Sequence, residues 1–193
     1  MRAFDTSYPQ VLAFITAAWI AVRALAALRA GRVLWRRELL LLTVYICLAV
    51  IARVVYFPMA LENGRIGLLR FNASRMPGGV NLVPFRHMFI RYPGWKLNII
   101  GNVAMFIPVG IFWPLCFKRL NGPFKTVLAG FGLSLIIELS QLLFYERRSD
   151  VDDLILNTAG VLIGAAIYFA ARAVIWMAKK HARKTSAEGK RVN

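Results

Sequence analysis

Cysteine and histidine are scarce in this sequence, with two residues of each among 193. The histidines are distant in sequence from Cys47 and Cys116, and no His or Cys spacing typical of a metal site occurs. Both cysteines fall within or at the end of apolar segments, which argues against an extracellular disulfide. We therefore predict no metal, no cofactor and no thiol catalyst.

Acidic residues are also few: 9 Asp and Glu stand against 25 Lys and Arg, for a net charge of +16. Such a charge is found in nucleic-acid-binding proteins, where the basic residues form a domain or patch. Here they lie in short segments between apolar blocks and in the C-terminal tail, as they do beside membrane spans. With 59% hydrophobic residues, the composition indicates an integral membrane protein without a nucleic-acid partner.

Long apolar runs are plentiful, and five of them are long enough to cross a hydrocarbon core, which takes about 20 helical residues. The predicted spans are residues 9–28, 38–60, 98–117, 126–144 and 154–178. The first is predicted to be a true span, because little charge precedes it, a basic cluster follows it and no small-residue cleavage site is evident. The expected fold is an all-α, polytopic helical bundle in the membrane.

The Lys and Arg residues of the connecting segments predict the orientation, because such residues concentrate on the cytoplasmic side. Four arginines follow the first span, three basic residues lie between the third and fourth, and six lie in the tail. These segments fall on one face, so we predict the N-terminus outside and the C-terminus in the cytoplasm. Segment 61–97, on the outer face, also carries six basic residues, which weakens the asymmetry.

Segment 134–164 places ionisable and amide side chains within and between two apolar spans. A carboxylate at membrane depth is costly, so such a group usually faces a protein interior or a wet cavity. In the predicted topology, six polar residues of three spans lie at one depth near the outer face: Asn98, Asn102, Glu138, Gln141, Asp153 and Asn157. Within each span they are three or four residues apart, and so share a helix face.

Charged residues are also found near these six polar residues in the predicted topology. Asp150, Asp152 and Asp153 precede the last span, where they can cap its helix or face a ligand. Arginines at 86, 91, 147 and 148 are expected around the polar residues, and a guanidinium suits phosphate or carboxylate. The alternative for Arg147 and Arg148 is that they neutralise the nearby aspartates.

Three further features concern backbone geometry. Gly160 and Gly164 form a small-xxx-small face that permits close approach of another helix. Pro108 is expected to kink the third span and to free the Ala104 carbonyl. The segment 78–98, rich in aromatic and arginine residues, resembles an interfacial segment, and its residues 81–85 are expected to form a fixed turn against the outer ends of the helices.

Three ordered blocks carry a family resemblance: NLVPF (81–85), NIIGNVAMFIPVG (98–110) and segment 134–164, with its E-x-x-Q pair, DVDD run and N-T-x-G-x-x-x-G ending. On these residues the chain resembles the VanZ-like membrane proteins, a family named for a teicoplanin-resistance factor of glycopeptide-resistant bacteria. The resemblance covers about residues 38–177 and implies a small helical protein of the bacterial cytoplasmic (inner) membrane. It supplies no settled reaction, so no catalytic role is carried over.

Three regions are predicted from these observations. Residues 1–37 hold an additional N-terminal transmembrane helix and a basic loop, and residues 38–178 form the VanZ-like membrane domain. Residues 179–193 form a basic, disordered cytoplasmic tail that is expected to lie on anionic lipid.

The polar residues that lie at one depth suggest a site that binds membrane lipid, a cell-wall precursor or a glycopeptide. Such binding would lower susceptibility to teicoplanin-type drugs. One alternative is an intramembrane enzyme that acts on a lipid-linked substrate with Glu138 or Asp153 as acid or base, although the lack of a nucleophile–base pair argues against an enzyme. Another is a structural assembly partner whose polar residues join helices. The candidate ligand-binding residues are Asn81, Phe85, Arg86, Asn98, Asn102, Glu138, Gln141, Arg147, Arg148, Asp150, Asp153 and Asn157.

Overall fold

The structure is a computed structural model that describes residues 4–57, 61–62, 65–71, 80–86, 95–144 and 147–189. In this part of the chain the long helices are α1 (Tyr8–Ala30), α2 (Trp35–Tyr56), α3 (Trp95–Cys116), α4 (Pro123–Gln141) and α5 (Val151–Gly189), with a 3-10 turn, η1 (Lys118–Leu120), between α3 and α4. All five helices are long and apolar enough to cross a membrane. The prediction of an all-α bundle with five spans is confirmed.

Helix ends differ from the predicted ones by a few residues. Helix α2 ends at Tyr56, before residue 60, because Phe57 is extended with φ −120° and ψ 141°. The residue before a proline disfavours helical geometry, and position 58 is a proline. Helix α4 begins at Pro123, three residues before the predicted start, since proline suits the first helical turn. Helix α3 continues without interruption through Pro108.

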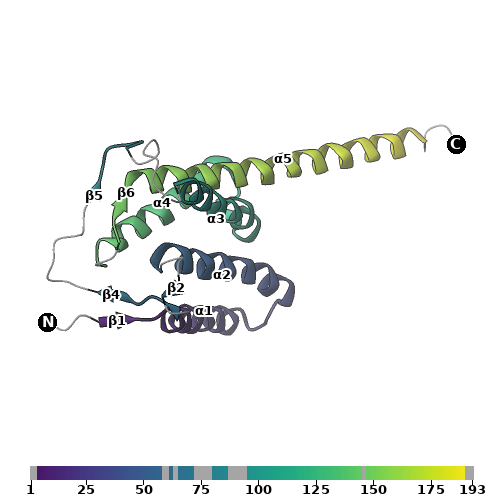
Figure 1. The fold of residues 1–193 in the computed structure, drawn as a ribbon. Helices are drawn as coiled ribbons and strands as arrows, with labels where there is room; N and C mark the ends of the chain where they lie inside the picture. The colour runs from purple at the N-terminus through teal and green to yellow at the C-terminus, as the bar shows by residue number, and fades with distance from the viewer. Residues whose placement is uncertain are drawn as a thin grey trace.

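The helices form two layers (Figure 1). Helix α3 packs against α5, α4 and α2, and α4 also packs against α5, whereas α1 contacts α2. None of the residues of α1 is buried. Polar contacts hold α1 to α2: Arg23 donates to both carboxylate oxygens of Glu38 at 2.8 and 2.6 Å, and the Thr16 and Tyr45 hydroxyls lie 2.8 Å apart. The charge of Arg23 within the first span is thereby paired, as membrane depth requires.

Close backbone contact joins α3 to α5. A Cβ atom added at Gly160 would meet the Val103 carbonyl oxygen, and one at Gly164 would meet the Ile107 carbonyl oxygen, both inside van der Waals contact. Gly110 of α3 faces the α5 backbone in the same way. The predicted close approach at Gly160 and Gly164 is confirmed. A buried apolar cluster lies beside this contact, formed by Ile51, Val55, Phe106, Val109, Ile137 and Val161.

Short strand pairs lie at the end of the bundle where α1, α3 and α5 begin (Figure 1). Strand β1 (Phe4–Thr6) pairs antiparallel with β4 (Leu69–Phe71), and β2 (Leu61–Glu62) pairs antiparallel with β3 (Arg65–Ile66). Strand β5 (Val80–Asn81) pairs in parallel with β6 (Ser149–Asp150), in the register Val80 to Ser149 and Asn81 to Asp150. This last pair fastens the segment before α3 to the connection between α4 and α5.

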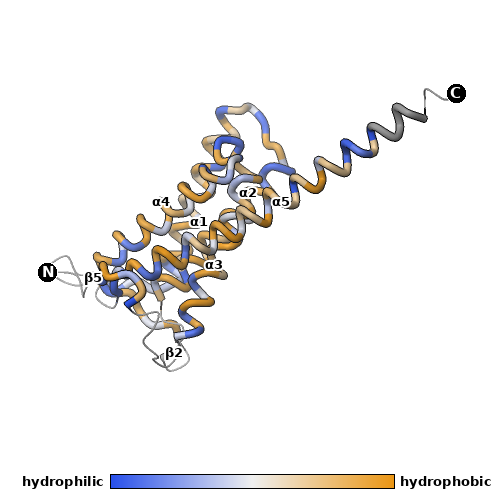
Figure 2. Tube along the Cα trace, turned by 90° about the horizontal axis from the view of Figure 1, so that it is seen from above, coloured by the Kyte–Doolittle hydropathy of each residue, from blue (hydrophilic) through white to orange (hydrophobic). Residues whose placement is uncertain are grey.

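Helix α5 extends far beyond the bundle, and its extension carries hydrophilic residues (Figure 2). Residues 170–183 are all exposed. The sequence predicted a disordered tail from residue 179, whereas the helix continues to Gly189, which corrects this expectation. The residues that follow Met177 are mostly Ala, Lys and Arg, with no Pro or Gly before Gly189, so helix propagates from the span into the tail.

The glycine contact predicts a selective loss of stability. Gly164→Ala should lower the free energy of unfolding by about 1–3 kcal/mol, because the new methyl group collides with the α3 backbone. Thermal unfolding of the purified protein in detergent measures this effect. Gly132→Ala is the matched control, since Gly132 also lies in a span and an added Cβ finds nothing within 4 Å. Equal unfolding midpoints for the two variants would contradict the close α3–α5 contact.

Candidate functional site

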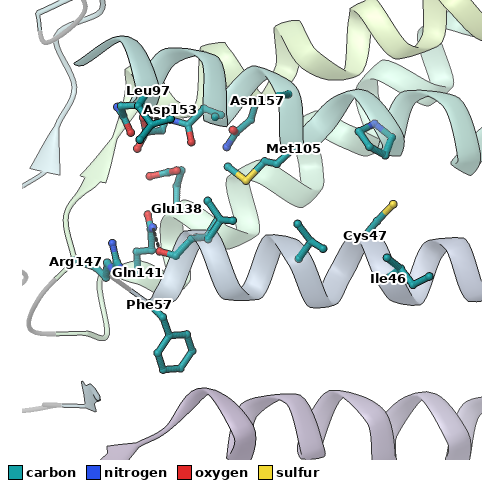
Figure 3. Close-up of a pocket in the computed structure, with 18 of the residues that line it drawn as sticks. Ile46, Cys47, Phe57, Leu97, Met105, Glu138, Gln141, Arg147, Asp153 and Asn157 are labelled. Atoms are coloured by element: carbon teal, nitrogen blue, oxygen red, sulfur yellow. Dashed lines mark hydrogen bonds between the residues drawn. The ribbon is translucent and has the colours of Figure 1, made fainter. Parts of the chain in front are cut away.

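A cavity of about 820 Å³ lies between α2, α3, α4 and the first turns of α5. Seven of the predicted residues line it: Asn98, Asn102, Glu138, Gln141, Arg147, Asp153 and Asn157. Figure 3 shows Glu138 in the middle of this polar group, with Gln141 and Arg147 on one side and Asp153 and Asn157 on the other. The structure thus brings together polar residues of three helices, as the sequence indicated. Their role in ligand binding stays a prediction.

Glu138 joins α4 to the connection that leads into α5. Its side chain is only 4% exposed, and its Oε2 accepts the backbone N–H of Asp150 at 2.9 Å. A carboxylate in this position is costly unless hydrogen-bond donors surround it. Strand β6 supplies two donors, the backbone N–H of Asp150 and the Ser149 hydroxyl, and the Glu138 side chain lines the cavity.

Asp153 joins α5 to α3. Its Oδ1 accepts a hydrogen bond from the Asn102 side-chain amide at 2.5 Å, across the contact that the glycines permit. Asn98, one turn before Asn102, lies at the exposed rim of the cavity. Within the described part of the chain, no three His, Cys, Asp or Glu side chains form a group that could hold a metal.

Two amides complete the polar wall. The Gln141 Nε2 donates to the Val55 carbonyl oxygen of α2 at 3.3 Å, and the Asn157 Nδ2 donates to the Ser134 hydroxyl of α4 at 3.0 Å. Both side chains are buried, at 6% and 1% exposure. Their oxygens, Gln141 Oε1 and Asn157 Oδ1, are buried atoms that accept no hydrogen bond from the described residues.

The three aspartates before α5 have three different roles. Asp150 caps the helix: its Oδ1 accepts the N–H of Asp152 at 2.9 Å and the Asn81 side-chain amide at 2.7 Å. Asp152 is buried and accepts the backbone N–H of Phe85, whose φ is +66°. Only Asp153 lines the cavity. Asp150, Asn81 and Phe85 are therefore not part of the cavity wall, and their predicted role in ligand binding stays a prediction.

The arginine ring is smaller than the sequence predicted. Arg147 lines the cavity, where its Nε donates to the Tyr56 carbonyl oxygen at 3.2 Å. Arg86 and Arg148 are exposed and are not part of the cavity wall, and Arg91 lies outside the described residues.

The sequence analysis missed the apolar part of the cavity. It follows a stripe on α2 (Thr43, Ile46, Cys47, Val50 and Val54) and a facing stripe on α3 (Gly101, Ala104, Met105, Pro108 and Phe112). In Figure 3 the labelled Ile46 and Cys47 lie away from the polar group, whereas Met105 lies beside Asn157. The α2 residues recur at intervals of three or four, but every face of this span is apolar, so spacing alone did not distinguish the cavity face.

Comparison with known proteins agrees with this architecture. The family model described as VanZ/LLP1 matches residues 42–175, from early α2 to the exposed part of α5. The chain is also 34% identical over 91 residues to Protein VanZ of Enterococcus faecium, a match that covers 46% of this chain and 52% of that protein. The chain thus spans about half the length of this curated relative. No solved structure matches the chain. With five helices able to span a membrane and a family match over most of its length, the chain is a multi-pass membrane protein that belongs to the VanZ/LLP1 family.

Proposed function

We propose that this protein binds an amphipathic molecule of the bacterial cell envelope in the cavity between α2, α3, α4 and α5. The occupant is an envelope lipid, a cell-wall precursor or a teicoplanin-type lipoglycopeptide, and its capture lowers susceptibility to such drugs. One observation carries this proposal: the cavity is polar at one end and apolar along α2 and α3. A headgroup and a hydrocarbon chain match these two parts.

A purely structural role explains less of the site. Side chains do join helices, since Gln141 donates to α2, Asn157 donates to Ser134, and the Tyr56 and Ser140 hydroxyls are in contact. However, residues whose only function is to hold helices together would pack against one another. Here Gln141 and Asn157 face a cavity of about 820 Å³, within the range of about 300–1,000 Å³ of small-molecule sites. The volume supports binding over assembly.

Two carboxylates in one cavity support an intramembrane enzyme as a second candidate. Glu138 or Asp153 would transfer a proton to or from a lipid-linked substrate. Each carboxylate already accepts a hydrogen bond from the protein, from Asp150 or from Asn102, which suits a held binding group as well as a base. Consumption of a labelled undecaprenyl-linked substrate by the wild-type protein, but not by Glu138→Gln, would favour this candidate over binding alone.

The proposal requires the cavity's polar end to face the cell exterior. We infer that the N-terminus is outside and the C-terminus in the cytoplasm of the inner membrane, because basic segments follow α1 and α3 and occupy the C-terminal part of α5, at the opposite end of the bundle. In that orientation, α3 and α5 begin, and α4 ends, at the outer surface.

Reporter fusions test this orientation. A green fluorescent protein fused after the C-terminus should fluoresce, and an alkaline phosphatase at the same position should be inactive, because the former folds in the cytoplasm and the latter needs the exterior. Fusions after Asn121, the residue that follows the η1 turn, should give the same pair of results. An active phosphatase at either position would reverse the topology and place the cavity in the inner leaflet.

Drug susceptibility tests the function. Expression of the wild-type chain in a susceptible Gram-positive host should raise the minimal inhibitory concentration of teicoplanin by about fourfold or more, which corresponds to roughly 1 kcal/mol of drug or precursor sequestration. Glu138→Ala should remove this increase, because it deletes the carboxylate at the centre of the site. Vancomycin, measured in parallel, should change less than the teicoplanin-type drug.

Two controls separate the site from expression effects. Asp5→Ala removes a carboxylate from exposed strand β1, outside the cavity, and should retain the wild-type susceptibility. Immunoblots of membrane fractions show whether Glu138→Ala accumulates like the wild type. If expression of the wild-type chain changes susceptibility to neither drug, the protein does not confer resistance to them.

A further inference from the structure

We propose that the cavity takes a lipid with a primary ammonium in its headgroup, and that one hydrocarbon chain of this lipid lies between α2 and α3. The inference rests on the proposed function, in which the cavity binds an amphipathic envelope molecule, and it names the chemical class of that molecule. Hydrogen-bond acceptors, depth and charge at the cavity wall carry it.

The polar end of the cavity has an excess of acceptor atoms. Glu138 and Asp153 contribute carboxylates, and Gln141 and Asn157 contribute amide oxygens. The two amide oxygens are buried and accept nothing from the described residues. Buried acceptors without a donor are costly, so a folded protein retains them where a ligand or water supplies the donor. A primary ammonium has three N–H donors and is a compact match for such a wall.

The direction of the Gln141 amide follows from its partner. Its Nε2 faces the Val55 carbonyl oxygen, which can only accept, so the Oε1 cannot exchange places with the nitrogen. In Asn157 the Nδ2 faces the Ser134 hydroxyl at 3.0 Å, which leaves the Oδ1 unpartnered among the described residues. Figure 3 shows Glu138 between these two amides. The two amides therefore flank the Glu138 carboxylate in the cavity wall.

Charge favours the same headgroup. Among the described residues, two carboxylates, those of Glu138 and Asp153, share the polar end with one guanidinium, that of Arg147. A headgroup with only a negative charge would lie beside both carboxylates. Like charges repel strongly in a site from which water is excluded. A zwitterionic headgroup can place its ammonium by the carboxylates and its phosphate toward Arg147.

The apolar part of the cavity has the length of one lipid chain in one leaflet. From Thr43 to Val54, the α2 stripe extends about 16 Å at 1.5 Å per residue. Half of a hydrocarbon core of about 30 Å is about 15 Å. Ile46 and Val50 on this stripe are 52% and 47% exposed, so the chain can enter from the bilayer. A water-soluble ligand would not require this lateral groove.

Lipid retention by the purified full-length chain tests the inference. The probes are phosphatidylethanolamine, phosphatidylcholine and phosphatidylglycerol with identical acyl chains, each titrated into delipidated protein and measured by native mass spectrometry. Phosphatidylethanolamine should bind at least tenfold more tightly than the other two. Phosphatidylcholine keeps the positive charge but has no N–H donor, and phosphatidylglycerol has the phosphate without an amine.

Matched variants locate the binding. Glu138→Gln should weaken phosphatidylethanolamine binding about tenfold, whereas Asp5→Asn, the same loss of one charge outside the cavity, should not. Val50→Trp should weaken the binding of all three lipids, because the larger side chain fills the groove on α2. Leu39→Trp is its control, on an exposed part of α2 away from the cavity. The Val50→Trp comparison leaves the polar hydrogen bonds intact, so it remains decisive if Glu138→Gln does not fold.

The outcomes separate this inference from the proposed function. Equal binding of phosphatidylcholine or phosphatidylglycerol, still blocked by Val50→Trp, overturns the ammonium preference and leaves the cavity as a lipid site. Binding of all three lipids that neither Glu138→Gln nor Val50→Trp reduces overturns the cavity assignment itself. Absence of binding by any of the lipids also overturns the inference, and the proposed function then rests on a cell-wall precursor or the drug.

Discussion

Three glycines let the backbones of α3 and α5 touch, and the cavity residues of these two helices are positioned by that contact. A side chain at Gly110, Gly160 or Gly164 would force the helices apart. Because the helices touch, Asn102 on α3 reaches Asp153 in the first turn of α5. Helix α4 then packs on α5 and contributes Glu138 beside them. Small residues are the usual means of helix association in lipid, where there is no hydrophobic driving force between apolar helices.

Charged groups at membrane depth are each given a specific partner, and this explains which polar residues remain for a ligand. Arg23 is paired with Glu38, away from the cavity. Asp150 and Asp152 hold the start of α5 and the turn at Phe85. Among the described residues, the polar wall of the cavity consists of the Glu138 and Asp153 carboxylates, four side-chain amides and the Arg147 guanidinium. Which charged residues line the site thus depends on which other charged residues have partners elsewhere in the fold.

The arrangement joins a polar group at one end of the bundle to an apolar groove along α2 and α3. A molecule bound there would lie within one leaflet, with its headgroup held by α3, α4 and α5 and its chain along α2. Envelope lipids, lipid-linked precursors and lipoglycopeptides all have this form, which is why one cavity accounts for several candidate ligands. The headgroup distinguishes among them, because its donors must match the buried oxygens of Gln141 and Asn157, which accept no hydrogen bond from the described residues.

The sequence by itself determined the membrane class, the five spans and the polar residues of α3, α4 and α5 that meet, because hydrophobic length and helical spacing are local properties. It also indicated the glycine face of α5. Tertiary structure decided three further features. It set the different roles of Asp150, Asp152 and Asp153, it left Arg86 and Arg148 outside the cavity wall, and it formed the apolar groove on α2. Capping and ligand binding use the same residue types, and a uniformly apolar helix does not reveal which face lines a cavity. Only the packing of α3 against α5 sets which side chains point inward.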